Sequence, residues 1–254
     1  MSPWTPQRCC LSPNDMEVFR VADEVFALLP EACFGVVIAR GVTQPEPGSA
    51  EAKTIAGRLA DAIESVRRRF ADTTVKSHPD ILPYREAFQR LGINPNRFPS
   101  SIEALVARIA KGGAVPSINP AVDLANISGL RHVVPLGVHD LDRCSGVIEV
   151  RQARMGDVFT PFGTTVREPV EPGEVVYVDN LEVRTRRWIW RQGEYSKATF
   201  ESTNLFYPID GFLDSNRENV LEARAELAAA LRELAGAMVI EAWVDREHRS
   251  TAVV

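Results

Sequence analysis

Residues 119–143 read NPAVDLANISGLRHVVPLGVHDLDR. This stretch holds two asparagines, three aspartates and two histidines, and it includes the mostly apolar run HVVPLGV at 132–138. A plain core strand would not carry so many polar side chains, because burying a polar group without a hydrogen bond costs free energy. We therefore interpret the stretch as a polar-rich pair of strands that faces a cleft.

Helix patterns occur on both sides of this stretch. In the longest of them, apolar residues follow one another at steps of three or four and so share one face of a helix. Two capping boxes, in which a serine is followed three residues later by a glutamate, predict the starts of two further helices. The predicted helices span about 50–71, 83–91, 100–111 and 215–235.

Strand patterns dominate the middle of the chain. Runs rich in valine, isoleucine and aromatic residues, separated by glycine and proline, predict strands. They lie at 34–42, 146–150, 175–179, 186–192, 203–209 and 238–244. Helices dominate the first half and the end, so the order is typical of an α+β fold. We expect an irregular N-terminal tail (1–14), one domain (15–245) and a C-terminal tail (246–254).

Composition and charge exclude several classes of function. The 254 residues are 45% hydrophobic and 25% charged, as in an ordinary globular protein. A net charge of −5 argues against a protein that wraps DNA, since such proteins usually carry a basic patch. No apolar run approaches the length of about 18–20 residues that a membrane helix needs, and no signal peptide pattern is present. With four cysteines and no C-x-x-C pair, we expect a cytoplasmic protein without membrane or DNA partners.

Motifs for cofactors and covalent catalysis are absent from the sequence. We find no P-loop, no H-E-x-x-H, no G-x-S-x-G and no G-x-G-x-x-G, and the four histidines do not have metal-ligand spacing. We therefore expect no cofactor and no metal. An enzyme with this sequence would position a water molecule with neutral hydrogen-bonding groups.

The stretch that opens this section also carries a resemblance to a known family. In order along the chain, the matching residues are Asn119, Val122, Asp123, Asn126, Pro135, Leu136 and Asp140. They resemble the patterns N-x-x-V-D-x-x-N-Y and G-x-P-L-H-x-F-D in the B3/B4 domain of the bacterial phenylalanyl-tRNA synthetase β subunit. The runs 84–113 and 186–194, followed by Thr203 and Asn204, are similar to freestanding B3/B4 proteins. The resemblance covers about residues 15–235.

The resemblance implies both a fold and an activity. The implied fold is a three-layer β/β/α arrangement of two sheets and a helical layer. In the synthetase, this domain hydrolyses the ester between tRNA and a wrongly attached amino acid. Nothing in the chain resembles the synthetase's module for activating amino acids. The resemblance therefore implies a trans-acting aminoacyl-tRNA deacylase, not a ligase. Its partners would be the aminoacylated 3′ end of tRNA and the amino-acid moiety.

The chain departs from the family's pattern in two places. The synthetase motif has a histidine directly after Pro-Leu, where this chain has Gly137. His139 lies two residues further on, and on a regular strand its side chain would point the same way. Arg191 and Gln192 stand near the place of a glycine pair in the synthetase's editing pocket. We therefore expect a different amino-acid pocket and do not carry over a specificity for tyrosine.

These matches yield a set of candidate site residues. Histidine can orient or deprotonate water, asparagine can both donate and accept, and aspartate can accept from a hydroxyl or an ammonium group. We predict that His139 and Asn126 are catalytic. The predicted substrate-binding residues are Asn119, Asp123, Gly137, Asp140, Arg191, Gln192 and Thr203.

Structural roles are open alternatives for several of these residues. Asn119 and Asp140 are suited to turns and helix caps, and Asp123 could be the buried partner of Arg131 or Arg187. Trp188 and Trp190 could stack on adenine or pack in the core.

Two other functions also fit the sequence. One is a module that binds tRNA ends or a free amino acid without catalysis. The other is a hydrolase of a different aminoacyl or small amide metabolite.

Overall fold

The computed structural model of the protein describes residues 17–251, and the predicted N-terminal tail (1–14) lies outside them. The helices of the described residues are α1 (Asp23–Leu28), α2 (Ala50–Arg69), α3 (Leu82–Arg90), α4 (Ser101–Ala110), α5 (Pro120–His132) and α6 (Arg217–Ala235), with two short 3-10 helices, η1 (Val75–Ser77) and η2 (Leu141–Arg143). Across residues 17–251, no helix has the length and apolar character needed to cross a membrane.

The strands form two sheets. The seven-stranded sheet has the order β1 (Phe19–Val21), β4 (Ile148–Gln152), β7 (Val175–Val178), β8 (Val183–Arg186), β5 (Val158–Phe159) and β6 (Glu168–Pro169), with β9 (Arg191–Gln192) paired to β8. The four-stranded sheet has the order β11 (Met238–Val244), β2 (Ala32–Arg40), β10 (Leu205–Phe212) and β3 (His139–Asp140), and all its pairs are antiparallel.

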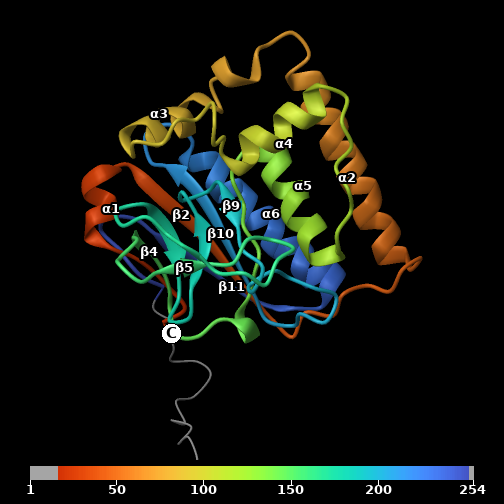
Figure 1. The fold of residues 1–254 in the computed structure, drawn as a ribbon. Helices are drawn as coiled ribbons and strands as arrows, with labels where there is room; N and C mark the ends of the chain where they lie inside the picture. The colour runs from red at the N-terminus through yellow and green to blue at the C-terminus, as the bar shows by residue number, and fades with distance from the viewer. Residues whose placement is uncertain (1–16, 252–254) are drawn as a thin grey trace, which may run out of the picture.

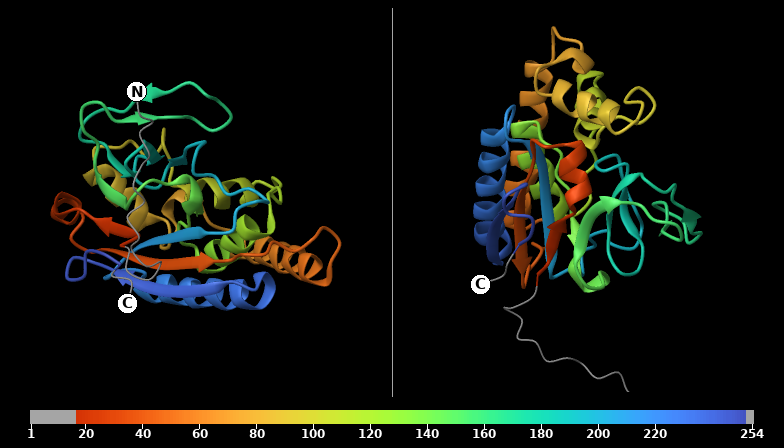
Figure 2. Two further views of the ribbon diagram at one scale, coloured as in Figure 1. Left: turned by 90° about the horizontal axis from the view of Figure 1, so that it is seen from below. Right: turned by 90° about the vertical axis from the view of Figure 1, so that its left-hand side faces the viewer.

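The two sheets and the helices form layers, as Figures 1 and 2 show. Helix α6 covers one face of the four-stranded sheet, and the seven-stranded sheet lies on the other face. Aromatic rings fill the space between the sheets, where Phe19 lies 5.7 Å from Phe34, 5.1 Å from Phe206 and 5.9 Å from Tyr177, measured between ring centroids. The predicted α+β class and its β/β/α layers are confirmed.

Two glycines let α6 approach the four-stranded sheet closely. A Cβ atom on Gly35 of β2 would lie 2.9 Å from Val220 Cγ1, and one on Gly211 of β10 would lie 2.3 Å from Val220 Cγ2. Both distances are shorter than a normal van der Waals contact. The absence of a side chain at these two positions therefore sets the spacing between helix and sheet.

Most predicted elements are confirmed with small changes at their ends. The capping box of α4 forms on the serine side, because Ser100 Oγ accepts a hydrogen bond from Glu103 N at 3.3 Å. The second capping box is wrong. Helix α6 begins at Arg217 after Asn216, and the hydroxyl of Ser215 donates to Asp214 at 2.7 Å.

The predicted pair of strands within 119–143 is also wrong. Residues 120–132 form α5, and only His139 and Asp140 lie in a strand. Asn119 caps α5 by accepting a hydrogen bond from Val122 N at 3.0 Å, and a proline occupies the first helical position, where its missing N–H is not needed.

The predicted strand 186–192 is interrupted. Strand β8 ends at Arg186, and β9 begins at Arg191. Between them, Arg187 and Trp188 have φ angles of 47° and 59°, in the left-handed region that non-glycine residues rarely adopt. The chain therefore turns here and does not continue along the sheet.

The first and last described segments of the chain are joined. Phe19 N donates to Thr251 Oγ1 at 3.1 Å, and Thr251 N donates to Phe19 O at 2.9 Å. Val21 N also donates to Arg249 O at 2.9 Å. Residues 249–251 thus complete the hydrogen bonding of β1.

Candidate functional site

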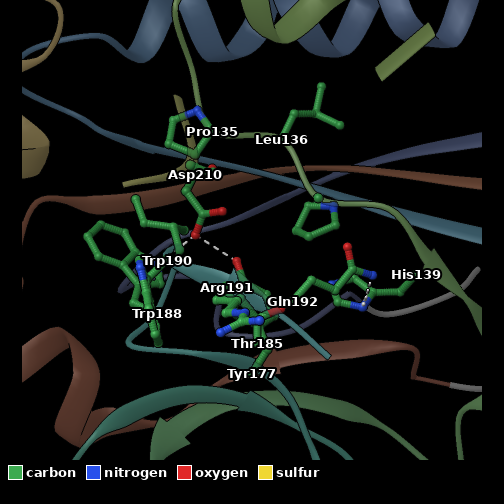
Figure 3. A pocket seen from close by; sticks show the side chains of 14 residues that line it. Pro135, Leu136, His139, Tyr177, Thr185, Trp188, Trp190, Arg191, Gln192 and Asp210 are labelled. Atoms are coloured by element: carbon green, nitrogen blue, oxygen red, sulfur yellow. Dashed lines mark hydrogen bonds between the residues drawn. The ribbon is translucent and has the colours of Figure 1, made fainter. Parts of the chain in front are cut away.

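A pocket lies where the two sheets meet the turn between β8 and β9 (Figure 3). Its walls come from Ser101 and from three regions that are distant in sequence: 135–139, 177–192 and 208–210. The lining residues are Ser101, Pro135, Leu136, Gly137, His139, Tyr177, Thr185, Trp188, Ile189, Trp190, Arg191, Gln192, Pro208 and Asp210. The cavity volume of about 90 Å³ suits a small group, and a nucleoside would have to remain at its mouth.

A buried carboxyl group forms part of one wall. Asp210 lies on β10 and is 2% exposed. Its Oδ1 atom accepts hydrogen bonds from Tyr177 Oη and from Trp188 Nε1, both at 2.6 Å (Figure 3). The turn after β8 thus has a structural reason, because it brings Trp188 from the seven-stranded sheet onto a carboxyl group of the four-stranded sheet.

Burial raises the pKa of Asp210 to about 7, although the two hydrogen bonds from Tyr177 and Trp188 lower it. A carboxyl group with such a pKa changes its charge near neutral pH. Strongly shifted groups in a cleft are frequent at functional sites.

The ring of His139 is held by neighbouring polar groups. Its Nδ1 atom lies 2.9 Å from Ser196 Oγ and 3.5 Å from Gln192 Nε2. The Gln192 amide also donates to Val138 O at 2.6 Å, which ties β9 to the segment that leads into β3. His139 is 1% exposed, and its ring stacks on Tyr177 with centroids 6.1 Å apart.

Burial, with a smaller effect of the Arg184 guanidinium, lowers the pKa of His139 to about 3. The imidazole is therefore neutral at physiological pH. It can orient a water molecule by hydrogen bonding, but it is too weakly basic to accept a proton efficiently near pH 7.

Gly137 leaves space beside this ring. A Cβ atom on Gly137 would lie 3.4 Å from His139 Nε2 and 3.2 Å from Pro208 Cγ. A histidine at position 137, as in the synthetase pattern, would occupy the same region as the ring of His139. Gly137 and His139 thus meet at one place in the structure.

Arginines and aromatic rings gather beside the mouth of the pocket, and we call them the rim cluster: Arg97, Phe98, Arg187, Trp190 and Arg191. The Arg187 guanidinium lies 3.9 Å from the centroid of the Phe98 ring and 4.6 Å from that of Trp190. Trp190 and Arg191 also line the pocket. The cluster combines positive charge with ring faces, as surfaces that bind single-stranded nucleic acid do.

Four predicted site residues lie together in the pocket: His139, Gly137, Arg191 and Gln192. Asn126 lies on α5 and lines a neighbouring cavity, which shares Ser101, Pro135 and Leu136 with the first. Asn126 and His139 therefore face two adjacent cavities.

Two predicted substrate-binding residues form hydrogen bonds with other residues of the chain at the start of α5. Asn119 caps the helix with its side-chain oxygen and donates from Nδ2 to Ala198 O at 3.1 Å. Asp123 accepts hydrogen bonds from the Ser117 hydroxyl and from Ile118 N. Neither lines the pocket that contains His139.

The arginine partners proposed for Asp123 are wrong. Arg131 pairs with Glu226, and Arg187 lies 3.8 Å from Glu174.

Asp140 and Thr203 also lie outside the pocket. Asp140 is buried and accepts hydrogen bonds from Ser202 Oγ at 2.6 Å and from Asp142 N at 3.0 Å. Thr203 is exposed, with its hydroxyl 3.5 Å from Asp142 Oδ2.

The sequence did not reveal that Tyr177 and Trp188 bond to Asp210, or that Ser196 bonds to His139. One signal was available, because Asp210 is the only charged residue in the apolar strand sequence LFYPIDGF. Of the two tryptophans, Trp188 packs in the core, whereas Trp190 is only partly buried at the pocket.

Within residues 17–251, no three metal-binding side chains come together.

The molecule is thus a layered α+β protein with a pocket between its two sheets. The model of the B3/4 domain family matches residues 83–236, more than half of the chain. The chain therefore belongs to the B3/4 domain family, which confirms the resemblance seen in the sequence.

The chain also shares similarity with a solved structure. An N-terminal fragment of the phenylalanyl-tRNA synthetase β subunit from Pyrococcus horikoshii is similar at 13% identity with a TM-score of 0.44. The similarity covers 90% of this chain and 56% of that chain, so the chain spans just over half of the fragment. None of the curated proteins matches.

Proposed function

We propose that the protein is a trans-acting deacylase, which hydrolyses the ester between a tRNA and a wrongly attached amino acid. Membership of the B3/4 domain family suggests a function related to tRNA. The observation that carries the proposal is the composition of the pocket, in which a neutral histidine, a glutamine and a buried carboxyl group surround a small cavity.

An aminoacyl ester needs only a modest catalyst, because it is already activated towards attack by water. The site must hold the ester and place one water molecule about 3 Å from its carbonyl carbon. His139 and Gln192 face the pocket as neutral hydrogen-bonding groups. In this proposal His139 orients the attacking water, and proton removal does not depend on a charged imidazole.

The rim cluster suits the 3′ end of tRNA. An adenine base could stack on Trp190, while Arg191 contacts a phosphate. The Arg191 side chain is exposed, and among residues 17–251 its guanidinium contacts the Trp190 ring, with 5.9 Å to the centroid, and forms no ion pair. A site that grips only the terminal nucleotides is compatible with the acidic net charge of −5.

The proposal is tested by deacylation of a panel of correctly and wrongly charged tRNAs. Each tRNA is incubated with the purified protein and, in parallel, without protein. We expect faster hydrolysis for a subset of wrongly charged tRNAs. No acceleration across a broad panel by the folded protein would reject the deacylase. Binding of tRNA or amino acid without turnover would then favour the non-catalytic module.

A pair of histidine variants tests the role of the pocket. His139→Ala should reduce the deacylation rate by about tenfold or more, whereas His248→Ala should leave it unchanged. The side chain of His248 is 72% exposed and belongs to none of the walls described above. Melting temperatures of both variants separate a loss of folding from a loss of activity.

A further inference from the structure

Four aspartates are buried in the described residues, and they differ in how their oxygens are used. Asp123, Asp140 and Asp179 each accept hydrogen bonds at both carboxylate oxygens. Asp210 accepts only at Oδ1. Its Oδ2 atom has no hydrogen-bond partner within residues 17–251, and Figure 3 draws no interaction to it.

Asp210 also lacks a cationic partner in this part of the chain. Two other buried carboxylates have one, because Arg184 Nη2 lies 2.5 Å from Asp179 and Arg85 Nη1 lies 2.5 Å from Glu103. Asp123 has no ion pair with a described residue either, but both of its oxygens accept hydrogen bonds. No ion pair reaches Asp210 from any described residue. A buried carboxylate that is not matched by a positive charge is costly, so a cation that entered the pocket would be bound favourably.

The orientation of this carboxyl group is fixed. Oδ1 is held by Tyr177 and Trp188, and the backbone carbonyl of Asp210 accepts from Tyr84 Oη at 3.0 Å. Asn216 Nδ2 in turn donates to Tyr84 Oη at 2.7 Å. Because these bonds hold one side of the residue, Oδ2 is the atom left for a ligand in the pocket that Asp210 lines.

We propose that Asp210 Oδ2 binds the free α-ammonium group of the aminoacyl moiety, so that the site selects esters with an unblocked amine. The inference rests on the proposed deacylase function and deepens it by naming the substrate class. An ammonium group supplies both the missing positive charge and a hydrogen-bond donor. An N-acylated amine supplies no positive charge to match the carboxylate. Peptidyl-tRNA and formylated aminoacyl-tRNA would therefore be spared.

Small ligands test this inference without tRNA. The probes are amides of the twenty amino acids and, for each one that binds, the 2-hydroxy-acid amide with the same side chain. Isothermal titration with the whole protein should show the amine bound about 10- to 100-fold more tightly than its hydroxy counterpart. Equal affinities, or no binding by any amide, would overturn the inference. This comparison needs no variant.

Asp210→Asn provides the second measurement. It should remove the preference for the amine and leave the affinity for the hydroxy amide unchanged, whereas Asp123→Asn, at a buried aspartate outside the pocket, should retain the preference. An Asp210→Asn protein that still prefers the amine would overturn the inference.

The same comparison on tRNA separates the inference from the proposed function. If aminoacyl-tRNA and hydroxyacyl-tRNA are hydrolysed by the wild-type protein at equal rates, the deacylase stands and the ammonium site is rejected. If Asp210→Asn slows both esters by the same factor, Asp210 acts on water or on the fold, and the ammonium site is again rejected. If neither ester is hydrolysed, the deacylase fails, and the amide titration alone decides the ammonium site.

Discussion

Asp210 and His139 lie in one pocket, and burial shifts their pKa values in opposite directions. In both cases the cause is the same, because a low-dielectric surrounding disfavours the charged form of any group. The imidazole is neutral, with a pKa of about 3, and the carboxyl group is only partly ionised near its pKa of about 7. The pocket therefore holds little charge by itself, and a charged ligand would change the protonation of Asp210.

The shift at Asp210 predicts a pH dependence of stability. Its folded pKa of about 7 lies above the ordinary value of 3.8, so between these pH values the folded state binds more protons than the unfolded state. The contribution of Asp210 to the free energy of unfolding should thus fall as the pH rises from about 4 to about 7. In Asp210→Asn this fall should be absent. The difference in the free energy of unfolding between the wild type and Asp210→Asn should therefore change by about 2–4 kcal/mol between pH 4 and pH 7.

Urea unfolding of both proteins at several pH values measures this difference. Asp123→Asn serves as the control and should keep the fall that is due to Asp210. Parallel curves for the wild type and Asp210→Asn across the window would contradict the shift.

The exposed guanidinium of Arg191 leads to a prediction about binding. Arg191→Ala should weaken the binding of tRNA several-fold and reduce the slope of log K against log salt by about one, as expected for a lost phosphate contact. Arg67→Ala on α2 is the control, because Arg67 pairs with Glu64 and does not line the pocket. Filter binding at several salt concentrations measures both effects, and unchanged affinity in Arg191→Ala would remove the rim cluster from the tRNA interface.

At the scale of elements, α6 and the four-stranded sheet are fitted to each other at Val220. Gly211→Ala should destabilise the protein by about 1–3 kcal/mol, because the new Cβ would lie 2.3 Å from Val220 Cγ2 and 2.8 Å from Asn216 Oδ1. Val220→Ala should restore part of this loss when combined with Gly211→Ala, although by itself it creates a cavity.

A double-mutant cycle of thermal unfolding measures the coupling between the two sites. Gly57→Ala on α2 is the control, since nothing lies within 4 Å of its added Cβ, and it should stabilise the protein slightly. Additive effects of Gly211→Ala and Val220→Ala would contradict direct contact.

The helices and strands also show which parts of the fold could be predicted from the sequence and which could not. Helix α2 was predictable from its one apolar face, whereas α5 is buried on several sides and lacks the contrast between faces that reveals a helix. The signals present for α5 were Asn119 as cap and the proline after it. The turn at Arg187 and Trp188 had no local signal, since tryptophan and isoleucine favour strands.

That turn depends on partners elsewhere in the chain. Glu174 Oε1 accepts from Arg187 N at 2.9 Å, and Asp210 accepts from the Trp188 indole. Pairwise contacts of this kind cannot be read from one sequence. The predicted residues that line the pocket, Gly137, His139, Arg191 and Gln192, were located by their place beside the family's motif. Three of the motif residues, Asn119, Asp123 and Asp140, hold the fold beside the site.

At the scale of the whole molecule, the junction between Phe19 and Thr251 closes the domain. Thr251→Val should destabilise the protein by about 1–2 kcal/mol, because it leaves the buried Phe19 N without its acceptor. Thr54→Val is the control, since Thr54 is exposed and bonds only within its own helix. Chemical denaturation measures both, and equal stability of the two variants would contradict a structural role for the junction.

This junction also bears on how the protein is made. Strand β1 pairs with β4, but Phe19 N and Val21 N lack their acceptors until residues 249–251 have left the ribosome. Phe19 packs on Tyr177, and Tyr177 holds Asp210. A polypeptide interrupted after residue 248 would thus contain every side chain of the pocket but lack the acceptors of Phe19 N and Val21 N. The last hydrogen bonds of the strand that packs against the pocket form only at a late stage of synthesis.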